Sequence, residues 1–139
     1  IVGFPNESDK DFQELVDFID EIKFDRLGVF IYSEEQGTIG ERFFSDNIPL
    51  EVKKQRWDEL MKLQMNISLS KNKKLINTVQ KVIIDTHTQE GFSIGRTFRD
   101  SPEIDNTVTF KKKLQIGEFY KTKILEASYY NLVGDICDA

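Results

Sequence analysis

The sequence has few of the residues from which catalytic and metal sites are commonly built. Among its 139 residues there is one cysteine, Cys137, and one histidine, His87. A single cysteine can form neither a disulfide nor a cysteine-based metal site within the chain, and a single histidine excludes a zinc-binding histidine pair. A Ser-His-Asp or Cys-His arrangement has equally little support. The scarcity of cysteine and histidine therefore predicts a binding role and no internal catalytic site.

Long apolar runs and an excess of positive charge are also missing. No stretch of about eighteen apolar residues exists, and Ile1–Phe4 lacks the basic flank and long apolar core of a signal peptide. We therefore expect a soluble, cytoplasmic protein with no membrane partner. The net charge is −5 at pH 7, which argues weakly against a nucleic-acid partner because phosphate binding needs many Lys and Arg side chains.

The excess of negative over positive charge lies in the first half of the chain. Residues 1–73 contain ten Lys and Arg against fifteen Asp and Glu, whereas residues 74–139 contain nine of each. A basic protein partner is compatible with this distribution.

The first part of the chain alternates between strand and helix patterns. Ile1–Phe4 is a short apolar run, and Ser8 followed by Asp11 predicts a helix that begins with a capping box. Leu27–Tyr32 is a nearly continuous apolar run, typical of a strand buried on both faces of a parallel sheet. We expect residues 1–46 to form a right-handed strand–helix–strand unit. Because the chain opens without Met in an apparent strand, we expect a piece of a longer protein.

A long helix is expected after the polar loop of residues 33–47. Pro49 suits the first turn of a helix because its missing amide hydrogen would be unpaired there, and the apolar stripe continues to about Lys71. Trp57 widens this stripe, and we interpret it as a packing residue in preference to a ligand-stacking one. Residues 47–72 are therefore predicted to be a connecting helix.

From Lys74 onward the apolar period changes to two, which indicates strands. Turn signals separate five β-rich runs, which are Val79–Ile84, Phe92–Phe98, Thr107–Phe110, Phe119–Leu125 and Leu132–Cys137. Five antiparallel strands in so short a stretch predict a small closed or nearly closed barrel over residues 73–139. Such barrels leave no exposed edges and usually serve as binding modules.

The segment Gly95–Asp105 carries the densest set of functional groups in this barrel. It contains five charged residues, one Pro and one Gly. Loops positioned by strands commonly hold binding residues, so we interpret the segment as a recognition loop. A solvated hairpin arm is an equally compatible interpretation of its composition.

Several segments resemble the C-terminal part of the radical S-adenosylmethionine methylthiotransferases, and the resemblance covers essentially the whole chain. The opening IVGFPNES is similar to the family's IVGFPGET, with Asn6 and Ser8 as departures. Phe24–Ser33 and Glu35–Thr38 resemble the last strand of the catalytic barrel and the loop after it, although Glu34 stands where the family commonly has Pro. The terminal barrel is similar to a TRAM domain. The resemblance thus implies the end of a partial TIM-like barrel, a linking helix and a TRAM barrel.

Two motifs of the terminal barrel are similar to the RimO branch of that family. DSPEID at residues 100–105 resembles the branch's DAPEID, and YNLVGD at residues 130–135 resembles its YDLVGE, while Gly95–Thr97 is shared more widely. RimO enzymes methylthiolate an aspartate of the small-subunit ribosomal protein at the decoding centre. The sister MiaB branch modifies an adenosine of tRNA. A tRNA-modifying enzyme and a stand-alone OB-like binding module remain the alternatives.

The resemblance implies that the parent enzyme uses two 4Fe-4S clusters and S-adenosylmethionine. The cluster-binding Cys-x-x-x-Cys-x-x-Cys motif cannot be made from one cysteine, so this part alone is expected to bind no metal and to be inactive. Its expected partners are the preceding domains of the same chain and a basic ribosomal protein.

The resemblance also implies two sets of site residues. The S-adenosylmethionine side of the barrel would be lined by Gly3, Phe4, Pro5, Phe30 and Tyr32, for which plain barrel core is the alternative. Recognition of a basic substrate protein would use Arg96, Arg99, Asp100, Glu103 and Asp105. The two arginines could instead contact phosphate or pair with a nearby carboxylate.

Overall fold

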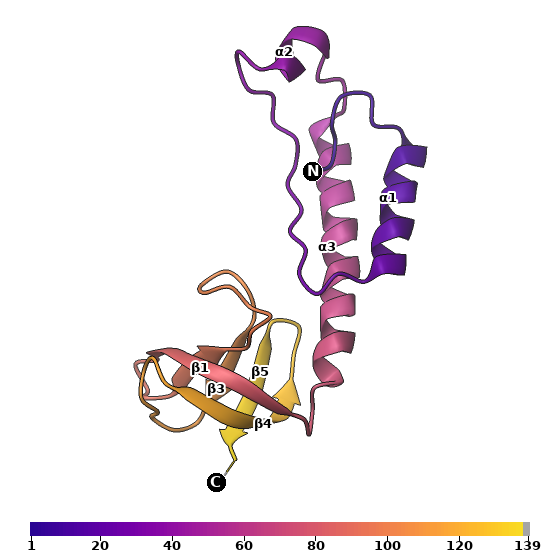
Figure 1. Cartoon of the computed structure of the whole chain (residues 1–139). Helices are drawn as coiled ribbons and strands as arrows, with labels where there is room; N and C mark the ends of the chain where they lie inside the picture. Colours follow the sequence, from indigo (N-terminus) through magenta and orange to yellow (C-terminus); the bar gives the residue numbers. More distant parts are fainter. Residues whose placement is uncertain (138–139) are drawn as a thin grey trace. The chain divides into compact units, whose positions relative to one another are not determined.

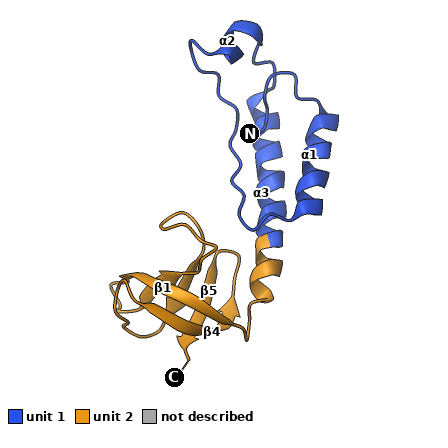
Figure 2. Cartoon of the chain, viewed as in Figure 1, with its two compact units in different colours: residues 1–67 blue, residues 68–139 orange. Residues whose placement is uncertain are grey.

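The structure is a computed structural model that describes residues 1–137, in which three helices are followed by five strands (Figure 1). The elements are α1 (Asp9–Ile22), α2 (Ile39–Phe43), α3 (Leu50–Lys73), β1 (Val79–His87), β2 (Ser93–Arg96), β3 (Thr107–Phe110), β4 (Phe119–Ala127) and β5 (Asn131–Ile136). They fall into two compact units, the first ending at Ile67 and the second beginning at Ser68 (Figure 2). The boundary lies within α3, and the predicted three-part division at residues 46 and 72 stays a prediction. Within residues 1–137 no helix has the length and apolarity needed to cross a membrane.

The parallel sheet expected in the first unit is reduced to a single bridge. Val2 pairs with Ile31 in the parallel sense, the Val2 amide donates to the Phe30 carbonyl at 2.9 Å, and the Tyr32 amide donates to the Val2 carbonyl at 2.8 Å. Phe30 is 71% exposed, so the prediction that Leu27–Tyr32 is buried on both faces is wrong for this chain. A buried parallel strand needs hydrogen-bonded neighbours on both sides, and residues 1–137 provide one. The radical-enzyme barrel is therefore not visible here and stays a prediction.

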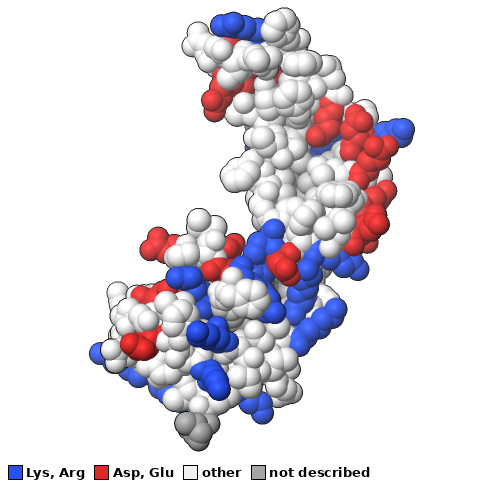
Figure 3. Space-filling view, in the orientation of Figure 1, with Lys and Arg blue, Asp and Glu red and all other residues white. Residues whose placement is uncertain are grey.

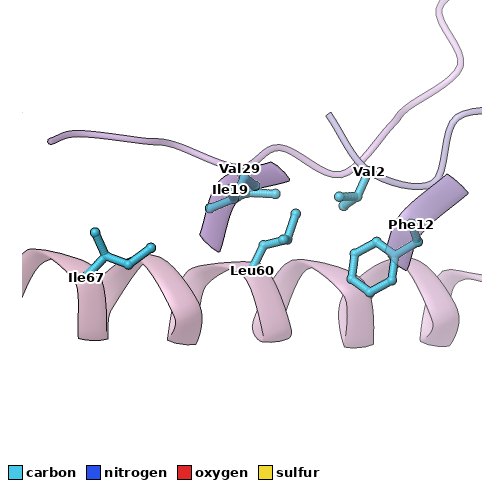
Figure 4. Close-up of a cluster of buried hydrophobic side chains, with 6 residues drawn as sticks. All are labelled: Val2, Phe12, Ile19, Val29, Leu60 and Ile67. Carbon is cyan, nitrogen blue, oxygen red and sulfur yellow. The ribbon is translucent and has the colours of Figure 1, made fainter. Parts of the chain in front are cut away.

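The helix α1 begins as the sequence predicts. Ser8 is its N-cap, the Asp11 amide donates to the Ser8 hydroxyl at 3.2 Å, and the Ser8 amide donates to the Asp11 carboxylate at 2.8 Å. This reciprocal pair satisfies two amide hydrogens that the first turn leaves unpaired. The buried face of α1 meets the apolar residues of α3 and of the extended segments, as Figure 4 shows for Val2, Phe12, Ile19, Val29, Leu60 and Ile67.

The helix α3 agrees with the predicted element to within two residues at its end, but its buried face is more polar than expected. Lys53, Arg56 and Gln64 are each no more than 5% exposed. Trp57 is 38% exposed, and its ring nitrogen donates to the Val29 carbonyl at 2.9 Å. The packing role predicted for it therefore stays a prediction. The loop before α3, expected to be irregular, contains the short helix α2, which begins after the N-cap Thr38.

The second unit is the closed five-stranded barrel that the period-two pattern predicted, with the strand order β1-β2-β3-β5-β4. Its core consists of apolar side chains at alternate strand positions, namely Val82, Ile84, Val108, Phe110, Ile124 and Leu132. The expectation that all strands are antiparallel is wrong for one pair, because β3 and β5 run parallel. A closed ring with an odd number of strands cannot alternate direction throughout, so at least one pair must be parallel.

Gly95 allows β1 and β2 to approach closely just before the loop that follows β2. A Cβ atom at Gly95 would lie 2.3 Å from the Ile83 carbonyl oxygen and 2.8 Å from Val82 Cγ1. Real Cβ atoms do not approach a backbone oxygen so closely, hence a larger residue would push the strands apart. This glycine therefore permits the close pairing of β1 and β2 near the start of the β2–β3 loop.

Candidate functional site

The loop between β2 and β3, residues 97–106, stands out from the barrel (Figure 1). The Thr97 hydroxyl donates to the Asp100 carboxylate at 2.7 Å, and the Ser101 amide donates to the Asp105 carboxylate at 2.8 Å. The Asp105 amide in turn donates to the Ser101 carbonyl at 3.4 Å. Side-chain bonds of this kind let short polar residues build a defined turn without regular secondary structure. The loop is thus held in shape by its own polar groups.

The two arginines predicted for recognition have different surroundings. Arg96 is on β2, where its Nε atom lies 3.1 Å from the carboxylate of Asp85 on the neighbouring strand β1. The Arg99 guanidinium lies 5.0 Å from the centre of the Phe98 ring, within the range of a cation–π contact. The sequence left open whether the two arginines contact phosphate or pair with a nearby carboxylate. Arg96 pairs with a carboxylate.

The three predicted acidic residues do not form a single exposed patch. Asp100 is only 6% exposed and binds Thr97, so its carboxylate shapes the loop from within. Asp105 is half-buried and also caps a turn of the loop. Glu103 is exposed, and it adopts a left-handed backbone conformation with φ of 64°. Glu103 is therefore the carboxylate of this group that a partner could reach most directly.

Phe98 and Ile104 are functional candidates that the sequence reasoning missed. Their exposed fractions, 83% and 84%, are the highest of any large apolar side chain among the described residues. Phe98 was expected to lie in the β-rich run Phe92–Phe98, and no individual role was expected of Ile104. Ile104 stands among polar residues outside any periodic apolar pattern, which was an available signal. Phe98 gave no such signal, because it continues the alternate positions of Phe92 and Ile94.

A second surface of the barrel is basic and aromatic. Lys81 of β1 stands directly opposite Lys121 of β4, and its ammonium lies 4.4 Å from the centre of the Phe119 ring. Lys123 follows on the same exposed face, and Figure 3 shows blue side chains over β1 and β4. Directly opposed like charges are unfavourable unless an anion or solvent compensates them. The zero net charge of this half of the sequence concealed the cluster, because strand alternation sorts charges onto separate faces.

The residues predicted to face S-adenosylmethionine are brought together only in part. The rings of Phe4 and Tyr32 meet edge to face at 5.1 Å and line a hollow of about 390 Å³. Partial burial raises the pKa of the Tyr32 phenol, and the charges of Glu34 and Asp46 raise it further. The other three predicted residues, Gly3, Pro5 and Phe30, are not part of this lining.

Gly3 has a structural reason to be glycine. Its φ is +73°, and a Cβ atom there would lie 2.3 Å from Lys53 Cγ. The aliphatic stem of Lys53 lies against Gly3, and its ammonium donates to both carboxylate oxygens of Asp46 at 2.6 and 2.7 Å. The glycine thus makes room for a buried lysine stem, which the sequence reasoning did not anticipate.

Arg56, one turn further along α3, binds the next part of the same segment. Its guanidinium donates to the carboxylates of Glu7 at 2.6 Å and Asp9 at 2.8 Å, while Glu7 also accepts the Gly3 amide at 2.9 Å. Only 6% of the Arg56 side chain and 12% of the Glu7 side chain are exposed. Buried charges are stable only when paired in this way, so α3 fixes the conformation of residues 3–9. Among the described residues no group of three or more His, Cys, Asp or Glu side chains is arranged to hold a metal ion.

Comparison with known proteins bears on both units. A model of the TRAM domain family matches residues 76–137. Over 99% of its length this chain is 46% identical to the ribosomal protein uS12 methylthiotransferase RimO of Clostridium tetani, of which it covers 31%. Proteins of the same name from Phocaeicola vulgatus and Thermosipho melanesiensis are 46% and 44% identical over 98% and 99% of this chain, which covers 32% of each. The chain thus spans about a third of the length of these relatives.

These similarities confirm the resemblance to RimO proteins that the sequence motifs indicated. The match to RimO proteins extends through the first unit as well as the barrel, and the barrel coincides with the TRAM match. The roles predicted for individual site residues stay predictions, because neither the geometry nor the similarity tests them.

Proposed function

Because this chain is related over its full length to the RimO methylthiotransferases and contains a TRAM domain, we propose that it is the C-terminal part of such an enzyme. The parent would add a methylthio group to the β-carbon of an aspartate in ribosomal protein uS12, in the cytoplasm. The observation that carries this proposal is 46% identity over 99% of the chain. In this proposal, other parts of the parent enzyme hold the 4Fe-4S clusters. This chain recognises the substrate and completes the catalytic barrel.

The first unit offers a partial fit to S-adenosylmethionine. When bound by the parent, this cofactor would supply the methyl group and the radical. Phe4 and Tyr32 are the residues of this chain that would contact it, since their rings line a hollow of about 390 Å³, within the range of about 300–1,000 Å³ typical of small-molecule sites. Gly3 would contribute indirectly, through the turn that Lys53 supports. Pro5 and Phe30 lie outside the hollow, so direct contact is not part of this proposal for them.

The barrel is proposed to hold the substrate protein with its β2–β3 loop. Ribosomal proteins bind RNA and are therefore commonly basic, so an exposed carboxylate such as Glu103 favours their approach. Arg96, already paired with Asp85, would support the loop from the barrel wall. Asp100 and Asp105 would preserve the loop's shape through their bonds to Thr97 and Ser101.

Modification of tRNA, as in the MiaB branch, is a second candidate, and the basic face of β1 and β4 favours it. Lys81, Lys121 and Lys123 could neutralise phosphates, and Phe119 could stack on a base. Against this, the identity with proteins named as uS12 methylthiotransferases extends over the whole chain.

The decisive experiment gives both substrates to the complete protein that contains this chain. The protein is reconstituted with iron and sulfide, then incubated with S-adenosylmethionine and a one-electron reductant such as dithionite, separately with purified uS12 and with unmodified tRNA. Mass spectrometry should find a methylthio group on an aspartate of uS12 and none on tRNA. The 139-residue chain treated identically should modify neither. Modified tRNA with unmodified uS12 would replace the proposal by the second candidate.

A further inference from the structure

We propose that Phe98 and Ile104, here called the anchor pair, bind the substrate protein by inserting into an apolar depression on its surface. The inference rests on the proposed function, because the occupant is the protein substrate of that reaction. It differs from the charge-based recognition expected from the sequence, in which five charged residues were the contacts. In this proposal, the affinity for the substrate protein comes mainly from the two apolar side chains of the anchor pair.

The β2–β3 loop buries three of its polar residues and exposes both of its large apolar side chains. Its polar residues Thr97, Asp100 and Asn106 are 2%, 6% and 3% exposed, whereas the anchor pair is more than 80% exposed. Transfer of a Phe or Ile side chain from water to an apolar environment is favourable. The fold of the barrel gives no reason for this exposure, since its core is complete without the two residues. A binding partner supplies such a reason.

The loop is also rigid enough to act as a preformed binding element. Bonds from Thr97 to Asp100 and from Ser101 to Asp105 fix the two halves of the loop, and the anchor pair lies in the segment that they hold. Glu103, directly before Ile104, is in the left-handed region with φ of 64°. A non-glycine residue keeps this conformation only where its surroundings impose it. Because little ordering is needed on binding, little affinity is lost to conformational entropy.

Charge selects a basic protein as the occupant over a nucleic acid. Residues 97–106 contain one arginine and three acidic residues, and the arginine lies against the Phe98 ring. An acidic, apolar loop repels a phosphate backbone and attracts a basic protein. Aromatic and aliphatic anchors surrounded by weaker polar contacts are the usual composition of a protein–protein hot spot.

The test compares two doubly substituted variants of the complete protein. One carries Phe98→Ser with Ile104→Ser, and the control carries Ile116→Ser with Leu125→Ser. The control residues are also exposed apolar residues of the barrel, at 52% and 47%, but lie outside the loop. The Kd for purified uS12 is measured by surface plasmon resonance, and methylthiolation is measured in parallel. Loss of the anchor pair should raise Kd about 10- to 100-fold, and the control should change it less than about twofold.

Two further measurements separate recognition from folding. The melting temperature of the anchor-pair variant should stay close to that of the wild type, because both side chains are more than 80% exposed and only the contact of Phe98 with Arg99 is lost. The conservative variant Phe98→Leu with Ile104→Val should restore most of the affinity. Glu103→Lys should weaken binding only a few-fold, and in a salt-dependent way.

The outcomes distinguish this inference from the proposed function. If the wild-type protein binds and modifies uS12 but the anchor-pair variant binds equally well, the inference is wrong and the proposed function stands. If the wild type neither binds nor modifies uS12, the proposed function fails and the inference fails with it. A loss of affinity in the control as large as that in the anchor-pair variant would also overturn the inference, because the effect would not belong to the loop.

Discussion

The two units of this chain satisfy their backbone and side-chain requirements by different means. In the barrel every strand has two hydrogen-bonded neighbours, and the core is apolar. In the first unit one parallel bridge joins the extended segments, and Lys53 and Arg56 are buried beside the apolar residues of α3. The barrel is therefore stabilised chiefly by apolar burial within a closed hydrogen-bond ring. The first unit depends in addition on particular charge pairs.

This difference shows which unit can bear exposed functional groups without losing its own structure. Every barrel strand is paired on both sides, and the barrel core is formed without Phe98 and Ile104, so the β2–β3 loop can carry the anchor pair without loss of that core. The first unit leaves several large apolar side chains in water for which its own fold offers no partner, namely Ile1, Phe30, Ile39 and Phe43. That exposure supports the proposal that the first unit completes a larger barrel, since a larger barrel would cover such side chains.

The largest expected effect comes from removing the centre of the barrel core. Phe110→Ala deletes a ring that is 0% exposed, and such deletions cost about 3–5 kcal/mol. Hydrogen exchange followed by mass spectrometry should show faster exchange throughout β1–β5. Trp57, the single tryptophan, lies in the first unit, so its urea-induced fluorescence transition should move little.

Phe119→Ala is the matched control, because its ring is 57% exposed. Its effect should stay within about 1 kcal/mol. If Phe110→Ala shifted the Trp57 transition as far as it shifts exchange in the barrel, the two units would unfold together. The two units would then differ in the residues that stabilise them but not in when they unfold.

The next effect should fall on the first unit alone. Arg56→Met leaves the Glu7 carboxylate, which is 12% exposed, without its cation. Breaking a fully buried pair costs about 3–5 kcal/mol, and we expect the lower end because Asp9 is in water. The Trp57 transition should move to lower urea while exchange in β1–β5 is unchanged. The surface variant Lys62→Met removes an exposed pair with Asp58, and a shift of equal size there would contradict a special role for Arg56.

Much of the fold followed from periodicity and caps. The start of α1, the extent of α3 and all five strand locations were predictable because each depends on residues close together in sequence. The parallel β3–β5 pair was also predictable in principle, since it follows from closing an odd number of strands. The buried Lys53 was not, because its burial depends on Asp46 and on the space above Gly3. Helical spacing does not report such contacts.

The candidate site shows the same limit. The position of the loop was predicted, but its strand was expected to continue to Phe98 and instead ends at Arg96. The Thr97 hydroxyl binds the Asp100 carboxylate and accepts the Arg99 amide at 3.2 Å, which begins a turn in place of another strand residue. That turn directs Phe98 outward and Asp100 inward. Composition identified the segment, whereas the contact residues follow from local bonds that only the geometry shows.

The smallest effect concerns pH and compares one carboxylate in each unit. Hydrogen bonds from the Ser8 side chain and backbone lower the pKa of Asp11 below its ordinary 3.8, and a bond from Lys112 lowers the pKa of Asp135 in the barrel. A depressed folded pKa means that the stabilisation is present above pH 3.8 and is lost as the pH falls through the folded value. Asp11→Asn should therefore reduce the acid sensitivity of the Trp57 transition, and Asp135→Asn that of exchange in β4 and β5. Because each carboxylate bonds only within its own unit, either substitution changing both readouts equally would show that acid acts on the chain as a whole.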